Sequence, residues 1–332
     1  MAQGRDIVYP DADDQLAALL TGARRLRLEA LGAFRIHHGR PGDPAAYLER
    51  LGDAAGVMLG WDLPVAVMRR APRLEVVSFL GTGAANFVDL AEAVRLGITV
   101  CNTPGYGDNA VAEHALALLL ALARRVPRLD QGLRQPERQR AEWGQSQPGF
   151  ELRGRTLGLV GLGGIGARMA ELARGLGMEV TAWTRNPSPE RAQRHGVTFL
   201  SLEELLETSD VISLHLLLTP ETEGLLGPEE LDRMKPDAVL VNTARAELVD
   251  QAALVERLRD GRIAAAGLDV FWNEPLPADH PLLELDNVVL TPHVAFNTPE
   301  AIATMMDIAI DNLARYFEGS PINVVAEPRR EC

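Results

Sequence analysis

A glycine-rich turn at residues 161–166 restricts the possible folds of this chain more than any other feature. It reads GLGGIG, follows the apolar run TLGLV directly, and opens the helical pattern IGARMAELARGLG. A G-x-G-x-x-G in this strand-to-helix context is typical of a dinucleotide-binding βαβ unit. Gly161 permits the tight turn, Gly163 lets the backbone approach a pyrophosphate, and Gly166 allows helix and strand to pack closely. The backbone at Gly164 and Ile165, at the positive end of the helix, is predicted to bind the anion.

Short apolar runs alternate with helical patterns on both sides of this turn. Such alternation indicates parallel sheets with helices on both faces. The expected strands are Ile7–Tyr9, Gly56–Leu59, Val76–Leu80, Ile98–Cys101, Thr156–Gly161, Glu179–Thr184, Asp210–His215, Ala238–Asn242, Ile263–Asp269 and Asn287–Leu290. The expected helices include Pro44–Leu51, Asp108–Val126, Ile165–Leu176, Asp250–Asp260 and Pro299–Phe317. The polar stretch 128–150 is expected to be an excursion that either packs against a partner subunit or forms a mobile surface loop.

Length and charge exclude several classes of function. The 332 residues allow two domains with full cores. The formal charge of −13 argues against general nucleic-acid binding, which needs clustered positive charge. No apolar run is long enough to span a bilayer, and no signal peptide is apparent. Cys101 and Cys332 give no disulfide framework, so we expect a cytoplasmic protein.

The strand after the glycine turn bears on the choice of cofactor. NAD sites usually place an acid about 20 residues after the turn, where it binds the ribose 2′-OH. Thr184 stands at this place and Arg185 follows it. A guanidinium could pair with a 2′-phosphate, which an acid would repel. The sequence therefore favours NADP(H), with NAD(H) still open; Arg185 could instead stack near the adenine or face solvent.

Three further segments, each just after a predicted strand, supply a guanidinium, a carboxylate and an imidazole. These groups are Arg245, Glu274 and His293. An arginine can bind the carboxylate and carbonyl oxygen of a 2-oxo acid, and a histidine can protonate the oxygen at C2 as hydride arrives. A glutamate paired to that imidazole orients it and favours its protonated form. No zinc-site or serine-hydrolase spacing is present, so no metal is expected.

The chain resembles the D-isomer-specific 2-hydroxyacid dehydrogenase family over nearly its whole length. The matching stretches are FLGTGAANFVDL, ITVCNTPG, VAEHALALLLALAR, LGLVGLGGIG, DVISLHLLLTPET, LDRMKPDAVLVNTARAELVD, GLDVFWNEP and LTPHVAFNT. The resemblance implies that Arg245, Glu274 and His293 form a catalytic triad. It also implies that Asp269 binds the nicotinamide carboxamide. Thr243 is a further predicted cofactor contact, and the backbone of the loop Leu80-Gly81-Thr82-Gly83 is implied to hold the substrate carboxylate.

The same resemblance implies the domain organisation. A Rossmann-type cofactor domain, residues 102–296, is inserted in a flavodoxin-like substrate domain made of residues 1–101 and 297–332. Each domain is a doubly wound parallel sheet. The long helix near residues 111–122 and the excursion after it suggest a homodimer.

The expected reaction transfers a hydride from NAD(P)H to a small 2-oxo acid and gives the (R)-2-hydroxy acid, as in glyoxylate or hydroxypyruvate reductases. Phosphoglycerate oxidation is one alternative, although Arg35 and Arg40 are unconvincing as phosphate ligands. A dimeric nucleotide-sensing corepressor is another. Among the remaining histidines, His114 is expected to be structural, His215 either packs or touches nucleotide, and His280 is expected to be exposed.

Overall fold

The computed structural model describes residues 5–135 and 148–328. Its chain divides into two compact units. Unit 1 consists of Met1–Gly107 and Thr298–Cys332, and unit 2 is the continuous segment Asp108–Asn297.

Unit 1 contains a sheet of five parallel strands with one antiparallel strand at its edge. The parallel strands are β1 (Ile7–Ala12), β2 (Phe34–His38), β3 (Gly56–Leu59), β4 (Val76–Phe79) and β5 (Thr99–Cys101). Their order is β2-β1-β3-β4-β5, and β13 (Val324–Ala326) pairs antiparallel with β5. The parallel order is the flavodoxin-like one, in which ligands bind beyond the carboxyl ends of the strands.

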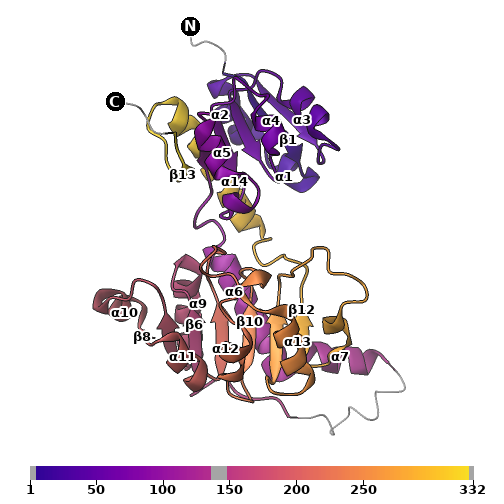
Figure 1. The fold of residues 1–332 in the computed structure, drawn as a ribbon, viewed down its shortest axis with the longest axis vertical. Coiled ribbons are helices and arrows are strands. Elements are labelled where there is room, and N and C mark those ends of the chain that lie inside the picture. Colours follow the sequence, from indigo (N-terminus) through magenta and orange to yellow (C-terminus); the bar gives the residue numbers. More distant parts are fainter. Residues whose placement is uncertain (1–4, 136–147, 329–332) are drawn as a thin grey trace. The chain divides into compact units, whose positions relative to one another are not determined.

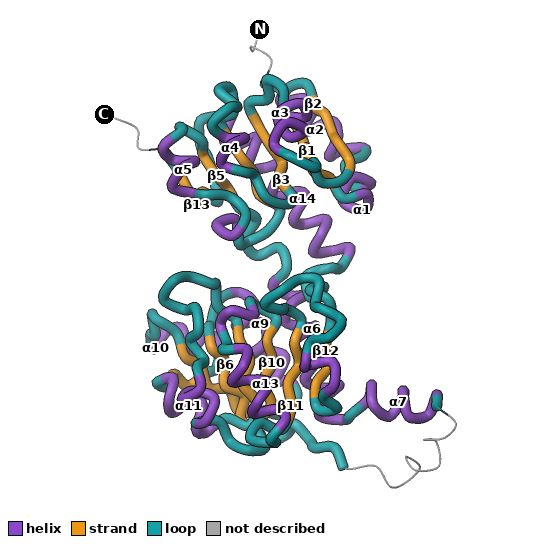
Figure 2. The backbone as a smooth tube through the Cα atoms, turned by 45° about the vertical axis from the view of Figure 1, so that its right-hand side comes forward, coloured by secondary structure: helices purple, strands orange, loops and turns teal. Residues whose placement is uncertain are grey.

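Helices cover both faces of this sheet (Figure 2). They are α1 (Asp14–Ala18), α2 (Gly22–Leu31), α3 (Pro44–Leu51), α4 (Val65–Met68), α5 (Leu90–Arg95) and α14 (Pro299–Phe317). One core lies under α3, α4 and α5, and the other contains Met305, Met306 and Ile310 of α14. The C-terminal helix therefore completes the core of the N-terminal unit, as the yellow and indigo ribbons in Figure 1 show.

A buried asparagine fixes this return of the chain. Asn312 on α14 is fully buried. Its amide donates to Ser78 Oγ on β4 and to the backbone oxygen of Asn102, and it accepts from Asn323. Because buried polar groups are costly without partners, these bonds specify the register of α14 on the sheet.

Unit 2 contains a seven-stranded sheet in which every pairing is parallel. The strands are β6 (Thr156–Val160), β7 (Glu179–Trp183), β8 (Thr198–Phe199), β9 (Val211–Leu214), β10 (Val239–Asn242), β11 (Ala265–Leu268) and β12 (Val288–Leu290). Their order, β8-β7-β6-β9-β10-β11-β12, is that of the Rossmann fold with one added strand. The predicted class, two doubly wound α/β domains, is confirmed.

Helices also cover both faces of the second sheet. They are α6 (Asp108–Arg124), α9 (Gly164–Gly175), α10 (Pro189–His195), α11 (Leu202–Thr208), α12 (Pro228–Asp232) and α13 (Gln251–Arg259). Helix α7 (Val126–Arg134) follows α6 and extends away from the sheet (Figures 1 and 2). Helix α6 and α9 bury one core with Leu119 and Met169, and α12 and α13 bury the other with Leu231 and Leu254. Within the described part of the chain, no helix is long and apolar enough to cross a membrane.

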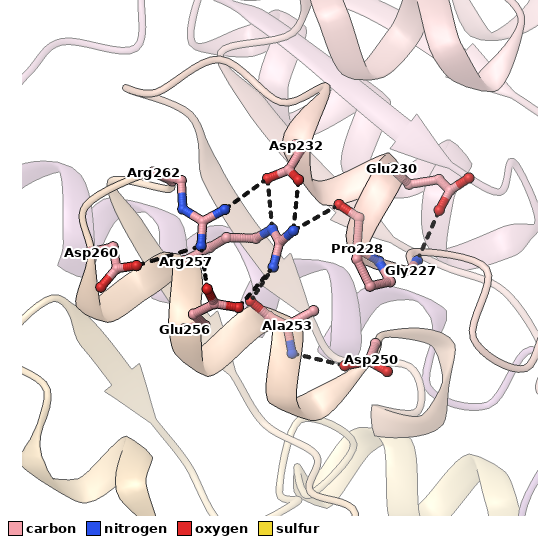
Figure 3. Close-up of polar contacts among 10 residues, drawn as sticks. All are labelled: Gly227, Pro228, Glu230, Asp232, Asp250, Ala253, Glu256, Arg257, Asp260 and Arg262. Carbon is pink, nitrogen blue, oxygen red and sulfur yellow. Dashed lines mark hydrogen bonds and ion pairs between the residues drawn. The ribbon is translucent and has the colours of Figure 1, made fainter.

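An arginine cluster ties α12 to α13 (Figure 3). The side chain of Arg257 is only 5% exposed and forms a two-bond pair with Asp232, at 2.8 and 2.7 Å. It also donates to the backbone oxygens of Pro228 and Ala253. Arg262 joins the cluster from the surface through Asp232 and Glu256. The buried guanidinium thus uses its donors on both helices.

Two expectations need correction. His280, expected to be exposed, is buried: its Nε2 lies 2.7 Å from Gln251 Nε2, and its Nδ1 accepts from the N–H of Leu282. The start of the predicted excursion is helical, because α7 extends to Arg134. The remainder of that stretch, residues 136–147, lies outside the described residues, as does Cys332.

Candidate active site

The carboxyl ends of six strands in unit 2 form one level row. Hydrogen-bond register aligns Trp183 with Val160, Val160 with Leu214, and Leu214 with Asn242; the row continues through Leu268 and Leu290. The residues that directly follow this row are Thr184, Gly161, His215, Thr243, Asp269 and Thr291. The strand order reverses between β6 and β9, and such a reversal point is where open α/β sheets bind ligands.

The glycine turn begins at this reversal point. Gly161 has a φ of +105°, and a Cβ there would lie 2.3 Å from the backbone oxygen of His215. A Cβ on Gly166 would lie 2.3 Å from the oxygen of Gly161, so helix α9 could not approach the strand with any other residue. In contrast, a Cβ on Gly163 would meet nothing within 4 Å. The face of the turn at Gly163 is therefore open, which leaves room for a pyrophosphate.

Two buried polar atoms that follow strand ends at this edge of the sheet have no partner among the described residues. They are Oγ1 of Thr243, after β10, and Nδ1 of His215, after β9. Burial lowers the pKa of His215 to about 4, so its imidazole is neutral near pH 7. Buried polar atoms without partners call for an explanation, and a bound polar group would supply it. The open turn and these two atoms fit a dinucleotide.

Thr184 and Arg185 lie at the end of β7, as expected from the sequence. Arg185 is half exposed and its Nη2 lies 3.7 Å from Glu221 Oε2. Arg191 on α10 donates to the backbone oxygens of Asn186 and Leu162. It thereby ties the loop that carries Arg185 to the glycine turn.

A histidine–carboxylate pair lies beyond β11 and β12. His293 Nδ1 is 2.7 Å from Glu274 Oε2, and the other glutamate oxygen accepts from the N–H of Phe271 at 3.0 Å. The two side chains are 36% and 37% exposed, so the pair is open to a ligand. Since Nδ1 is bound to the carboxylate, Nε2 is the ring nitrogen left to exchange a proton.

Arg245 follows β10, the strand next to β11. Asn242 holds the local turn, because its side chain donates to the oxygen of Arg245 and accepts from the N–H of Ala244. The guanidinium of Arg245 donates from Nη1 to the backbone oxygen of Ala244, at 2.6 Å. The loops that carry Arg245, Glu274 and His293 thus leave the same edge of three neighbouring strands.

Asp269 is fully buried, and its carboxylate accepts hydrogen bonds from the loop at residues 291–295. It accepts from Thr291 Oγ1 at 2.6 Å and from the N–H groups of Val294 and Ala295 at 3.0 and 2.8 Å. His114 Nε2 lies 3.5 Å from Oδ1 of the same carboxylate. Contact with a carboxamide stays a prediction for this residue.

The loop at residues 80–83 follows β4 in unit 1. Leu80 is buried, its N–H donates to Leu59, and the N–H of Gly81 donates to Phe79. The oxygens of Gly81 and Thr82 accept from Thr103 and Asn102, which fixes the loop. Among the described residues, none accepts a hydrogen bond from the backbone N–H of Thr82 or Gly83. Binding of a substrate carboxylate by these two N–H groups stays a prediction.

Reasoning from the sequence missed two residues of this site. Asp108, the first residue of α6, places its carboxylate against Gly164: a Cβ on Gly164 would lie 1.8 Å from Asp108 Oδ2. His114, expected to be structural, contacts the loop of His293 through Thr291. Neither pairing has a short-range sequence signal, because each joins positions far apart in the chain.

Fold and site together define a dinucleotide-dependent oxidoreductase. The family model for the NAD binding domain of D-isomer specific 2-hydroxyacid dehydrogenases matches residues 116–295. The chain belongs to this family, which confirms the resemblance stated from its motifs.

Relatives and solved structures agree with this assignment. A glyoxylate reductase of Aeropyrum pernix is 44% identical over 83% of each chain. A D-3-phosphoglycerate dehydrogenase of Archaeoglobus fulgidus is 40% identical over 80% of this chain, which spans half of that relative. The structure of an NADPH-dependent glyoxylate/hydroxypyruvate reductase from Sinorhizobium meliloti, in complex with NADP and malonate, has a TM-score of 0.84 at 33% identity. That comparison covers 99% of this chain and 100% of the other.

Proposed function

We propose that this protein reduces a small 2-oxo acid, of the glyoxylate or hydroxypyruvate type, to the (R)-2-hydroxy acid. The observation that carries the proposal is the His293–Glu274 pair, which lies beyond the same sheet edge as the glycine turn and Arg245. The glyoxylate reductase and the glyoxylate/hydroxypyruvate reductase to which the chain is similar support it.

The roles of the side chains follow from their chemistry. Bound NAD(P)H supplies the hydride. Arg245 binds the substrate carboxylate and carbonyl oxygen. His293 donates a proton from Nε2 to the carbonyl oxygen as negative charge develops there. Glu274 holds the imidazole at Nδ1 and stabilises its cationic form.

A substrate panel tests this function. Purified protein is mixed with NADPH or NADH and with glyoxylate, hydroxypyruvate, pyruvate or 3-phosphohydroxypyruvate, and the loss of nicotinamide absorbance is followed. We expect turnover of the unphosphorylated acids. Preference for the phosphorylated acid would favour the phosphoglycerate dehydrogenase alternative, and cofactor binding without turnover of any acid would favour a nucleotide sensor.

Replacement of the proton donor gives the sharpest check. His293→Ala should lower kcat by about 10²–10⁴-fold, the usual contribution of a general acid, while the dissociation constant of the cofactor stays near that of the unmodified protein. Glu274→Gln should give a smaller loss, because the imidazole remains but loses its charged partner. Full turnover by His293→Ala would reject the assigned role.

We further propose that the enzyme prefers NADPH. In support, Arg185 directly follows Thr184 at the end of β7, and its exposed partner Glu221 is 3.7 Å away, a distance that leaves the guanidinium free to exchange partners. Arg185→Ala should raise KM for NADPH more than KM for NADH. An equal rise for both cofactors would contradict the phosphate role.

We also propose that the protein is a cytoplasmic homodimer. In support, α7 extends away from the sheet of unit 2 in Figures 1 and 2 and exposes Val126 and Leu133. Cys101 is buried and free, which suits a reducing compartment. Light scattering coupled to size exclusion should give twice the chain mass, and Leu133→Glu should shift the protein toward the monomer.

A further inference from the structure

His293 has a backbone conformation that residues other than glycine rarely adopt. Its φ is +54°, in the left-handed region where a Cβ crowds the backbone. Such a conformation persists only where the surrounding structure holds it. The contacts on either side of His293 therefore decide where its imidazole lies.

One carboxylate binds the chain on both sides of His293. Before the histidine, Asp269 Oδ1 accepts from Thr291 Oγ1 at 2.6 Å. After it, the two oxygens accept from the N–H groups of Val294 and Ala295. Since Asp269 is fully buried, no water competes for these bonds. Asp269 thus clamps residues 291–295 as a unit.

The direction of the hydrogen bonds can be assigned. Burial would raise the pKa of Asp269, but the bonds from His114, Thr291 and the two backbone N–H groups hold this pKa below its usual value. The carboxylate is therefore ionised and only accepts, so the single proton of the Thr291 hydroxyl points to it. The hydroxyl oxygen then accepts from His114 Nε2, which lies 2.9 Å away. The same Nε2 is 3.5 Å from Asp269 Oδ1, so its shorter contact is with Thr291. Nε2 of His114 must carry a proton.

We propose that His114 and Thr291 are positioning residues for His293. The chain of bonds from His114 Nε2 through Thr291 Oγ1 to Asp269 fixes the loop at residues 291–295, and so sets where the imidazole of His293 delivers its proton. His114 is suited to this task because α6 packs against β11 and β12, the strands that carry Asp269 and the loop. This inference rests on the proposed function, in which His293 is the proton donor.

Paired substitutions at Thr291 test the proposal. Thr291→Val removes the hydroxyl at nearly constant shape and should lower kcat by about 10–100-fold, as expected for a misplaced catalytic group, with little change in the dissociation constant of NADPH. Thr291→Ser keeps the hydroxyl and should stay within about threefold of the unmodified enzyme. Thr208→Val removes an exposed hydroxyl bonded to Glu204 in the same unit and is the control; it should leave kcat unchanged.

Substitutions at His114 test the other end of the chain. Gln can donate from a similar position, so His114→Gln should retain more activity than His114→Leu. The double variant His114→Leu with Thr291→Val should be no slower than Thr291→Val alone, because both changes break one series of bonds. Hydrogen–deuterium exchange of peptides covering 288–297 should quicken in Thr291→Val and His114→Leu, and not in the control.

Several results would overturn the inference: unchanged kcat in Thr291→Val, equal losses in the Val and Ser variants, additive effects in the double variant, or unchanged exchange at 288–297. Unfolding midpoints measured for every variant separate loss of function from loss of fold. Failure of the proposed function would look different, since His293→Ala would then keep its turnover whatever happens at Thr291. Hydrogen–deuterium exchange does not depend on activity, so it tests whether His114 and Thr291 hold the loop in either case.

Discussion

Single residues in this protein act through the charge or hydrogen bond that they place beside a strand end. Asp108 is the clearest example in the cofactor site. Its carboxylate lies against Gly164, at the amino end of α9, where an anion is expected. Arg168, the nearest basic residue on α9, is bound to Asn109 and Glu171 and does not pair with it. Asp108 thus brings a negative charge to the place where a pyrophosphate would bind.

This placement predicts a cofactor affinity that falls with rising pH. Burial raises the pKa of Asp108 above its usual value, so more of this carboxyl stays neutral than in an exposed aspartate at the same pH. A bound pyrophosphate favours the neutral form further, so cofactor binding takes up a proton and affinity is lost as the carboxyl ionises. The repulsion is worth about 1 kcal/mol in a water-like environment, or roughly fivefold in the dissociation constant. Fluorescence titration of NADPH from pH 5 to pH 8 measures it.

Asp108→Asn removes the charge and should bind NADPH more tightly above pH 6, with a flatter pH profile. Asp237→Asn, an exposed change before β10 at the opposite edge of the sheet, is the control. Equal pH profiles for Asp108→Asn and the unmodified protein would contradict this role.

At the scale of elements, two glycines of the turn at residues 161–166 have different roles. Gly166 is needed for the packing of helix α9 on the strand, and Gly163 for the approach of the cofactor. Gly166→Ala places a Cβ 2.3 Å from the oxygen of Gly161 and should lower both stability and cofactor affinity. Gly163 has an ordinary φ of −80° and open space around it, so Gly163→Ala should unfold at nearly the normal midpoint. It should still weaken NADPH binding, because its methyl group occupies the face that a pyrophosphate approaches. Thermal melting and NADPH titration of both variants test these expectations. Equal unfolding midpoints of the two variants would contradict the different roles of the two glycines.

The arginine cluster between α12 and α13 makes a prediction about stability. Arg257→Met leaves the backbone oxygens of Pro228 and Ala253 without their donor and should lower the free energy of unfolding by about 1–3 kcal/mol. Arg262→Met, at a side chain that is 42% exposed, should cost less than about 1 kcal/mol. Urea unfolding gives the free energy of unfolding of each variant. Equal losses in the two variants would show that burial of the Arg257 guanidinium does not account for its contribution to stability.

The sequence was most informative where an element is buried. Strands such as Gly56–Leu59 and helices such as Pro44–Leu51 and Pro299–Phe317 have the bounds predicted, since an apolar run or a proline start marks them. In contrast, α2 was missed: it has four charged residues and buries only Leu28. Two of its arginines contact Asp307 and Asp311 on α14, 283 and 284 positions away, which no local pattern reveals. The strand Phe34–His38 lies at a sheet edge and is mostly half buried, so its pattern is equally weak.

The candidate active site, too, could be predicted from the sequence only in part. Residues directly after a strand could be predicted, because strand ends in a parallel sheet meet at one edge. The partners of those residues could not. The clamp of Asp269 on Val294 and Ala295 uses backbone N–H groups, which leave no trace in the identity of the residues that donate them.

At the scale of the whole molecule, the two units differ in how the chain forms them. Unit 2 is one continuous segment, whereas unit 1 needs both ends of the chain. A fragment of residues 108–297 contains both faces of its own sheet and both of its cores. We therefore expect this fragment to fold alone, to melt cooperatively and to bind NADPH. Circular dichroism and cofactor titration test the expectation; a fragment that lacks a cooperative transition would contradict it.

The level row of strand ends has a practical meaning for protein engineering. Backbone hydrogen bonds, rather than side chains, set the positions from which the six loops depart. A loop can therefore be exchanged for one from another enzyme without moving its neighbours, provided that the strand keeps its length. Deleting a single strand residue would be far more damaging, because it draws the attached side chain back by about 3.3 Å and turns it to the other face of the sheet.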